Sequence, residues 1–189
     1  MPFAKKNAPF GEIMLKKGLI QIYTGDGKGK TTAAIGQAIR AFGSGLEVCY
    51  VSFFKNDKRW KCGELSVLKR LAIDVFSFAE KHPHFDKGVN FEQASKECKK
   101  GTDFIRDILK QKKYDVLILD EILVALHDGF IEEDEVLKIL QTKPLRTELI
   151  LTGRGTTRLL LEAADLVTEM KKEKHPYDTG VEARKGIEY

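Results

Sequence analysis

A glycine-rich segment between an apolar run and a helical pattern most constrains how this chain can fold. It follows the apolar residues 19–23, precedes a helical pattern over residues 31–42, and reads Thr24-Gly25-Asp26-Gly27-Lys28-Gly29-Lys30-Thr31-Thr32. Glycines let backbone N–H groups surround phosphate oxygens, the lysine adds positive charge, and a threonine hydroxyl can ligate magnesium. The order strand, loop, helix therefore predicts a triphosphate-binding loop.

The spacing of this loop differs slightly from the usual P-loop pattern. That pattern places its first glycine at position 24, whereas this chain has Thr24 there and offers Gly25 one step later. We therefore expect a variant loop, shortened by one residue or wrapped differently. A glycine-rich turn without a ligand is the alternative, and the complete order of strand, lysine, hydroxyl and helix argues against it.

Further apolar runs predict the remaining strands of one domain. They lie at residues 48–53, 73–78, 115–120, 148–151 and 166–170, and they alternate with helical patterns at 65–71, 91–112, 131–140 and 159–164. This alternation predicts an α/β fold: a single P-loop domain with a mostly parallel central sheet of about six strands and helices on both faces. We expect residues 18–189 to form that domain. Residues 1–17 are expected to form an N-terminal arm, either a frayed tail or a segment that folds over a ligand or a neighbouring subunit.

Two other stretches are expected to join the loop at the carboxyl edge of the sheet. The run Val116-Leu117-Ile118-Leu119 ends in Asp120 and Glu121, which is the Walker B arrangement, and either carboxylate could hold magnesium opposite Thr31. The strand at 148–151 ends in Thr152-Gly153-Arg154-Gly155. The guanidinium of Arg154 suits a phosphate, and a surface arginine in a tight turn is the alternative.

Composition argues against several other kinds of protein. The net charge of +4, from 32 basic and 28 acidic residues, does not favour a nucleic-acid partner. Cys49, Cys62 and Cys98 are widely spaced, which favours a reducing cytosol over a disulfide framework or a zinc site. His82 and His84 supply only half a metal ligand set. No run is long enough for a secretory signal or a membrane span, so we expect a soluble cytoplasmic protein.

Four separated pieces together resemble the P-loop ATP:corrinoid adenosyltransferases. They are the loop 23–32, the run 116–121, the arginine turn 151–155 with Glu162-Ala163-Ala164-Asp165-Leu166-Val167-Thr168-Glu169-Met170, and the tail segments Lys174-His175-Pro176-Tyr177-Asp178 and Lys185-Gly186-Ile187-Glu188-Tyr189. The resemblance covers nearly the whole chain from Gly18. The arginine turn and the tail are its most distinctive parts.

The resemblance implies transfer of the 5′-deoxyadenosyl group of ATP to the cobalt of a reduced corrinoid, cob(I)alamin or a cobinamide-type compound, with release of triphosphate. ATP would be wrapped by residues 24–32, with Lys30 and Arg154 as positioning groups and magnesium on Thr31 and Glu121, or on Asp120. No acid or base catalyst is implied, because cobalt(I) is itself the nucleophile. A homodimer completed by the N-terminal arms and an electron donor such as a flavoprotein reductant are also implied.

One stretch departs from the family. Where relatives carry an aromatic pair with a tryptophan against the corrin, this chain has Lys81-His82-Pro83-His84-Phe85-Asp86. Phe85, with His84 beside it, is the candidate corrinoid contact, and the second aromatic position is unfilled. This departure leaves two alternatives open, an ordinary P-loop ATPase or phosphotransferase and a non-catalytic protein that binds ATP or a corrinoid.

Overall fold

The computed structural model describes residues 15–55, 63–81 and 88–188 of the chain. Its strands are β1 (Ile20–Thr24), β2 (Val48–Phe53), β3 (Asp74–Phe78), β4 (Val116–Asp120), β5 (Glu148–Thr152) and β6 (Leu166–Glu169). Its helices are α1 (Lys30–Gly43), α3 (Gly63–Arg70), α4 (Phe91–Gln111), α5 (Ile122–His127), α6 (Glu133–Thr142), α7 (Arg158–Ala163) and the 3₁₀ helix η1 (Pro176–Thr179).

The six strands form one sheet in the order β3-β2-β4-β5-β1-β6, and every neighbouring pair is parallel. The predicted fold class is therefore confirmed. A parallel sheet places the carboxyl ends of all its strands at one edge, so the segments that follow β1, β2, β4 and β5 meet there. Strand β4 lies between β2 and β5, and all five of its residues are buried.

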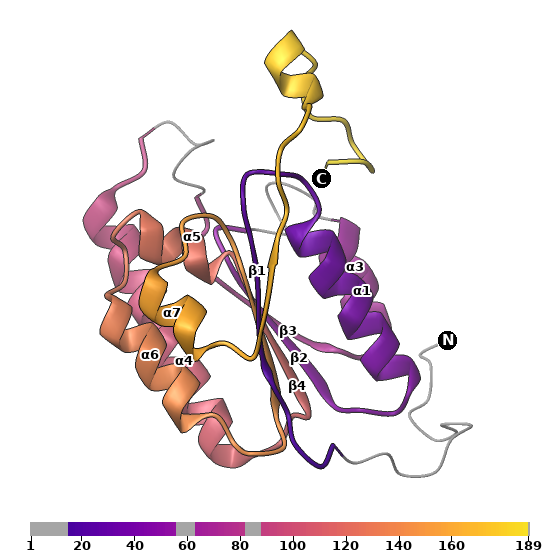
Figure 1. Cartoon of the computed structure of the whole chain (residues 1–189), viewed down its shortest axis with the longest axis vertical. Coiled ribbons are helices and arrows are strands. Elements are labelled where there is room, and N and C mark those ends of the chain that lie inside the picture. The colour runs from indigo at the N-terminus through magenta and orange to yellow at the C-terminus, as the bar shows by residue number, and fades with distance from the viewer. Residues whose placement is uncertain (1–14, 56–62, 82–87, 189) are drawn as a thin grey trace.

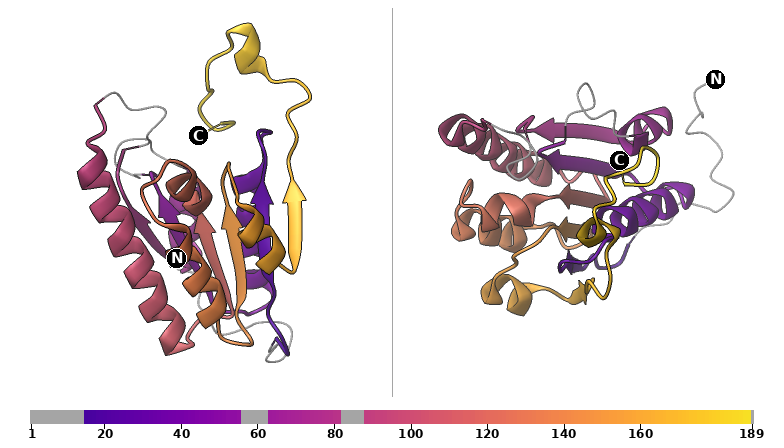
Figure 2. Two further views of the ribbon diagram at one scale, coloured as in Figure 1. Left: turned by 60° about the vertical axis from the view of Figure 1, so that its left-hand side comes forward. Right: turned by 90° about the horizontal axis from the view of Figure 1, so that it is seen from above.

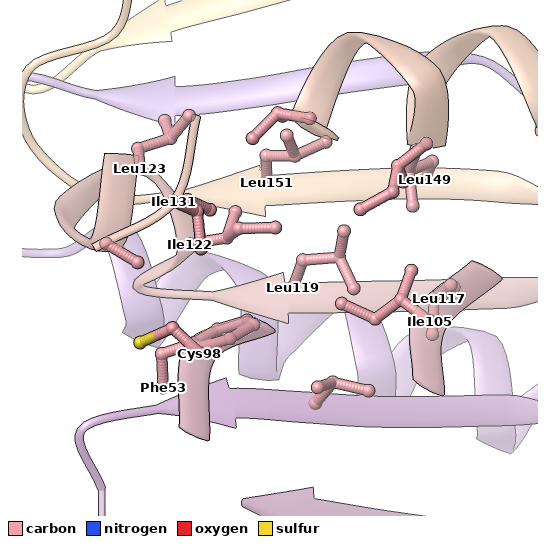
Figure 3. Packing of buried hydrophobic residues seen from close by; sticks show 14 of the residues in the cluster. Phe53, Cys98, Ile105, Leu117, Leu119, Ile122, Leu123, Ile131, Leu149 and Leu151 are labelled. Carbon is pink, nitrogen blue, oxygen red and sulfur yellow. The ribbon is translucent and has the colours of Figure 1, made fainter. Parts of the chain in front are cut away.

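Helices cover both faces of the sheet (Figure 1). Helices α1 and α3 lie on one face, where Ala34, Ala38, Leu65 and Leu68 pack against strand residues such as Ile118. Helices α4, α5, α6 and α7 lie on the other. That second core contains Phe53, Cys98, Ile105, Leu117, Leu119, Ile122, Leu123, Ile131, Leu149 and Leu151 (Figure 3). Burial on both faces explains why β4 is apolar without alternation.

Two elements differ from the sequence predictions. Helix α5 was not predicted, because Ile122-Leu123-Val124-Ala125 is buried throughout and shows no amphipathic period. The tail beyond β6 contains the 3₁₀ helix η1, which was not among the predicted elements. The other predicted elements are present, and their ends lie within two residues of those predicted.

The chain continues beyond the end of β6 and passes the glycine-rich loop (Figure 2). Strand β6 pairs with β1 along one edge only, and all four of its residues are exposed. The Met170 N–H donates to the carbonyl of Thr24 across 2.8 Å, which extends the contact beyond β6. Within the described parts of the chain, no helix is both long and apolar enough to cross a membrane.

Candidate active site

The glycine-rich loop begins at the end of β1 and runs directly into α1, as predicted. Gly25 and Gly29 adopt positive φ values of 98° and 124°, which side chains disfavour. The chain after β6 lies so close that a Cβ on Gly25 or Gly27 would be 2.6 Å from the Met170 carbonyl oxygen. The Gly27 N–H donates to that same oxygen. Glycine is therefore required here both by backbone conformation and by space.

Lys30 is buried at the first position of α1. Its Nζ donates to the carbonyl oxygens of Gly25 and Gly27, each across 2.7 Å. Burial lowers the pKa of Lys30, and the nearby Arg154 charge lowers it further, whereas Glu121 opposes the shift. The loop thus wraps around the ammonium group that a phosphate would contact.

Asp120 is the centre of the polar contacts at this edge. Its carboxylate is fully buried, and Oδ1 accepts hydrogen bonds from Thr31 Oγ1 at 2.9 Å and from Thr152 Oγ1 at 2.7 Å. The other oxygen, Oδ2, lies 2.7 Å from Nζ of Lys55. Burial alone would raise the pKa of Asp120, but the charge of Lys55 and the hydrogen bonds from Lys55, Tyr50 and Thr152 together lower it. Asp120 is therefore held as a carboxylate.

Glu121 follows Asp120 in a left-handed conformation, with φ of 62°. Such backbone is uncommon for a residue with a side chain and clusters at functional positions. Its N–H donates to Thr152 Oγ1 across 3.0 Å, which fixes the turn from β4 into α5. Burial and the neighbouring Asp120 charge raise the pKa of Glu121, whereas Lys55, Lys30 and Arg154 oppose the rise.

The turn after β5 presents Arg154 at the same edge. Arg154 is exposed, and its charge acts on the pKa of both Lys30 and Glu121. Gly153 has φ of 138°, and a Cβ there would lie 2.8 Å from the Val124 backbone nitrogen. The tight turn thus packs on α5 and leaves the guanidinium facing solvent beside the loop.

The site chemistry suits a hard divalent cation. Thr31, Asp120 and Glu121 offer hydroxyl and carboxylate oxygens, the ligands that magnesium prefers, and the Lys55 ammonium already lies between the first two as a stand-in cation. Among the described residues, no group of three or more His, Cys, Asp or Glu side chains could hold a metal by itself. A magnesium ion here would share its coordination with phosphate oxygens.

The structure brings together Lys30, Thr31, Asp120, Glu121 and Arg154, as the sequence predicted. Three other residues of the predicted loop are exposed, namely Asp26, Lys28 and Thr32. Lys28 turns toward the C-terminal tail, where its Nζ donates to the Ile187 carbonyl at 2.7 Å and lies 3.8 Å from Glu188. His84 and Phe85, the predicted corrinoid contacts, lie outside the described residues.

Sequence reasoning missed Thr152 and Lys55. Thr152 was quoted only as part of the arginine turn, yet its hydroxyl connects Asp120 to the Glu121 backbone. Lys55 was passed over as the start of a polar loop. The available signal was its place just beyond the strand predicted at 48–53, and only the structure shows that this strand lies next to β4.

The first strand of the parallel sheet leads through a glycine-rich loop into a helix, and a buried carboxylate lies beside this loop at the end of a central strand. This arrangement defines the P-loop class of α/β proteins. Within that class, the family model of the ATP:corrinoid adenosyltransferases BtuR/CobO/CobP matches residues 16–189, and the chain belongs to this family. It is thus a transferase whose family acts on ATP and a corrinoid.

Curated relatives agree with this assignment. The chain is 36% identical to a corrinoid adenosyltransferase of Sinorhizobium sp., with 100% of this chain and 90% of the relative covered. It is 34% identical to the corrinoid adenosyltransferase of Escherichia coli K12, with 98% and 92% covered. It is also 34% identical to corrinoid adenosyltransferase CobA of Salmonella typhimurium, with 97% and 91% covered.

A solved structure supports the fold alone. The flagellar accessory protein FlaH from Methanocaldococcus jannaschii matches with a TM-score of 0.54 and 15% sequence identity, over 84% of this chain and 73% of that one.

Proposed function

We propose that this chain transfers the 5′-deoxyadenosyl group of ATP to the cobalt of a reduced corrinoid. The cobalt(I) electron pair forms a bond to C5′, the C5′–oxygen bond breaks, and its electron pair leaves with triphosphate. The observation that carries the proposal is the convergence of the loop, the Thr31–Asp120 pair and Arg154 at one edge of the sheet, in a chain of this family.

The proposed roles of the chain follow from charge and position. Residues 24–32 wrap the triphosphate, with Lys30 exchanging its two carbonyl partners for phosphate oxygens. Arg154 adds a second cation from the exposed turn, and both groups stabilise the charge that develops on the leaving triphosphate. No side chain needs to move a proton, because neither bond made nor bond broken involves one.

We further propose a magnesium ion on Thr31 and Glu121, with Asp120 held behind them by its hydrogen bond to Thr31. Bound magnesium would neutralise charge on the triphosphate. The oxygen chemistry of these side chains supports this assignment. Replacing Glu121 with Gln is expected to raise the magnesium concentration needed for half-maximal turnover at saturating ATP. An unchanged magnesium dependence would remove Glu121 from the ligand set.

Three parts of the proposal concern partners. Residues 81–86, with His84 and Phe85, contact the corrinoid, and an electron donor such as a flavoprotein supplies the cobalt(I) state.

The chain forms a homodimer in which the arm, residues 1–17, closes a neighbouring site on domain 18–189. Exposed apolar residues on β6 and α7, including Leu159 (51% exposed) and Val167 (43%), support a subunit contact along this edge. Light scattering that gives a monomer mass would contradict it.

The experiment that tests the reaction is an anaerobic assay with chemically reduced cobalamin, magnesium and ATP. The corrinoid spectrum is followed while the phosphate product is identified. We expect adenosylcobalamin with one equivalent of triphosphate. ADP without a change in the corrinoid would indicate an ordinary ATPase or phosphotransferase, and binding without either product would indicate a non-catalytic protein.

A further inference from the structure

The Lys55 ammonium lies where the loop and β4 meet. Its Nζ is 2.7 Å from Asp120 Oδ2, 3.2 Å from Thr31 Oγ1 and 3.7 Å from Glu64 Oε1. Ser52 of β2 is the register partner of Asp120, so Lys55 follows closely beyond the same edge of the sheet. Phe54, which precedes Lys55, is buried and left-handed, with φ of 60°, and its N–H donates to the Phe78 carbonyl of β3 across 3.0 Å. The position of Lys55 is therefore fixed by the sheet and not by a free loop.

The charges around Lys55 balance without any ligand. The side chain of Asp120 is 0% exposed and that of Lys55 only 16%, so each needs the other as a partner. Burial raises the pKa of Glu121, and the positive charges of Lys55, Lys30 and Arg154 oppose that rise. Burial lowers the pKa of Lys55, and the negative charges of Asp120, Glu121 and Glu64 act in the opposite direction. A divalent cation that entered alone would meet the Lys55 ammonium and would unbalance this cluster.

Lys55 and a magnesium ion would both contact the hydroxyl oxygen of Thr31. Its hydroxyl donates its hydrogen to Asp120 and accepts a hydrogen bond from Lys55 at 3.2 Å. A hydroxyl ligates a metal through its oxygen lone pairs, so Lys55 engages the atom that magnesium would use. Asp120 Oδ2, the other nearby oxygen, is likewise occupied by Lys55.

We propose that Lys55 is the resident cation of the magnesium position. In the nucleotide-free protein it neutralises Asp120 and occupies the Thr31 oxygen, so that the site excludes free divalent cations and admits magnesium only with a polyphosphate, whose negative charge offsets both cations. The inference rests on the proposed function, because it assumes a magnesium site at Thr31 and Glu121. It assigns Lys55 as the residue that couples metal binding to nucleotide binding.

The test is a manganese titration of the nucleotide-free full-length protein, followed by the EPR signal of free Mn²⁺. Lys55→Met is compared with wild type and with Lys113→Met. Lys113 is a matched control because it also pairs with an aspartate at 2.8 Å, but it is exposed and precedes β4 at the opposite end of the strand. Removing a cation a few ångströms from the metal should tighten Mn²⁺ binding by about 10-fold or more, and Lys113→Met should behave as wild type. Unchanged or weaker binding by folded Lys55→Met overturns the proposal.

A second variant and a second measurement guard against loss of folding. Lys55→Met with Asp120→Asn removes both charges of the buried pair and should return Mn²⁺ binding to the wild-type level or below. Tight binding by this double variant overturns the proposal. With wild type alone, inorganic triphosphate should strengthen Mn²⁺ binding to the protein by about 10-fold or more. Equal binding with and without triphosphate overturns it as well.

The two proposals fail in different ways. If wild-type adenosyl transfer needs no magnesium, the proposed metal site is wrong whatever the manganese titration gives. If transfer requires magnesium but Lys55→Met binds Mn²⁺ no better than wild type, the proposed function stands and only the role of Lys55 is lost.

Discussion

The hydroxyl of Thr31 donates a hydrogen bond to the carboxylate of Asp120 across 2.9 Å and so joins the first turn of α1 to the last residue of β4. This bond connects the two strongest motifs of the sequence at one point of the site. Because Asp120 is buried, its contacts support both the fold and the position of the Thr31 oxygen.

Asp120→Asn should be strongly destabilising. The change removes the nearest countercharge of the largely buried Lys55 ammonium, and breaking a buried ion pair typically costs about 3–5 kcal/mol of unfolding free energy. Urea denaturation measures the effect. The control is Asp74→Asn, which breaks the more exposed pair with Lys113 and should cost less than about 1 kcal/mol of pairing energy. Equal losses in the two variants would contradict the central role of Asp120.

Lys30→Ala should weaken ATP binding and turnover together. Loss of a charged hydrogen-bond donor typically costs about 1.5–3 kcal/mol, which corresponds to roughly 10- to 150-fold in affinity. Calorimetric titration with ATP provides the measurement, and Lys113→Ala, with the same change of charge at the other end of β4, is the control. An affinity within threefold of the control, a margin of about 0.6 kcal/mol, would show that the loop does not use Lys30 to bind phosphate.

Gly153→Ala should unfold more readily than Gly129→Ala. Both glycines have positive φ, 138° and 76°, but a Cβ meets the α5 backbone only at Gly153, while nothing lies within 4 Å at Gly129. The control isolates the conformational cost of about 1–2 kcal/mol, and the clash should add about 1–3 kcal/mol. Chemical denaturation of the two variants gives the difference. Similar denaturation midpoints for the two variants would mean that α5 shifts to accommodate the added Cβ at little cost.

The thiols of Cys49 and Cys98 should resist alkylation in the native protein. Burial raises the pKa of each from 9.0 to about 12, so the reactive thiolate is about a thousandth as abundant in mildly alkaline buffer. Iodoacetamide labelling, followed by mass spectrometry of the two cysteine peptides, should show protection that disappears in denaturant. Because the unfolded thiols ionise first, stability from these groups is complete below pH 9.0 and falls as the pH rises above it. Rapid native labelling of Cys49 would contradict its burial.

The sequence predicts the fold well where local patterns carry the information. The run before Asp120 is apolar because β4 is buried on both faces, and the loop before α1 needs its glycines for backbone reasons. Strand order is not encoded in such patterns, and neither is the pairing of Lys55 with Asp120. That pair arises only when β2 and β4 become neighbours. Helix α5 escaped prediction because its first four residues are all buried, which leaves no amphipathic period.

The hydrogen bonds between the loop carbonyls and Lys30 also set a threshold for ligands. Any anion that recruits this ammonium must replace its hydrogen bonds to the Gly25 and Gly27 carbonyls. A singly charged anion would gain little from that exchange, whereas a chain of phosphates bound as proposed would gain from Lys30, Arg154 and the loop N–H groups at once. With that mode of binding, the self-contacts of the loop would favour polyphosphates over the smaller anions that are abundant in any cell.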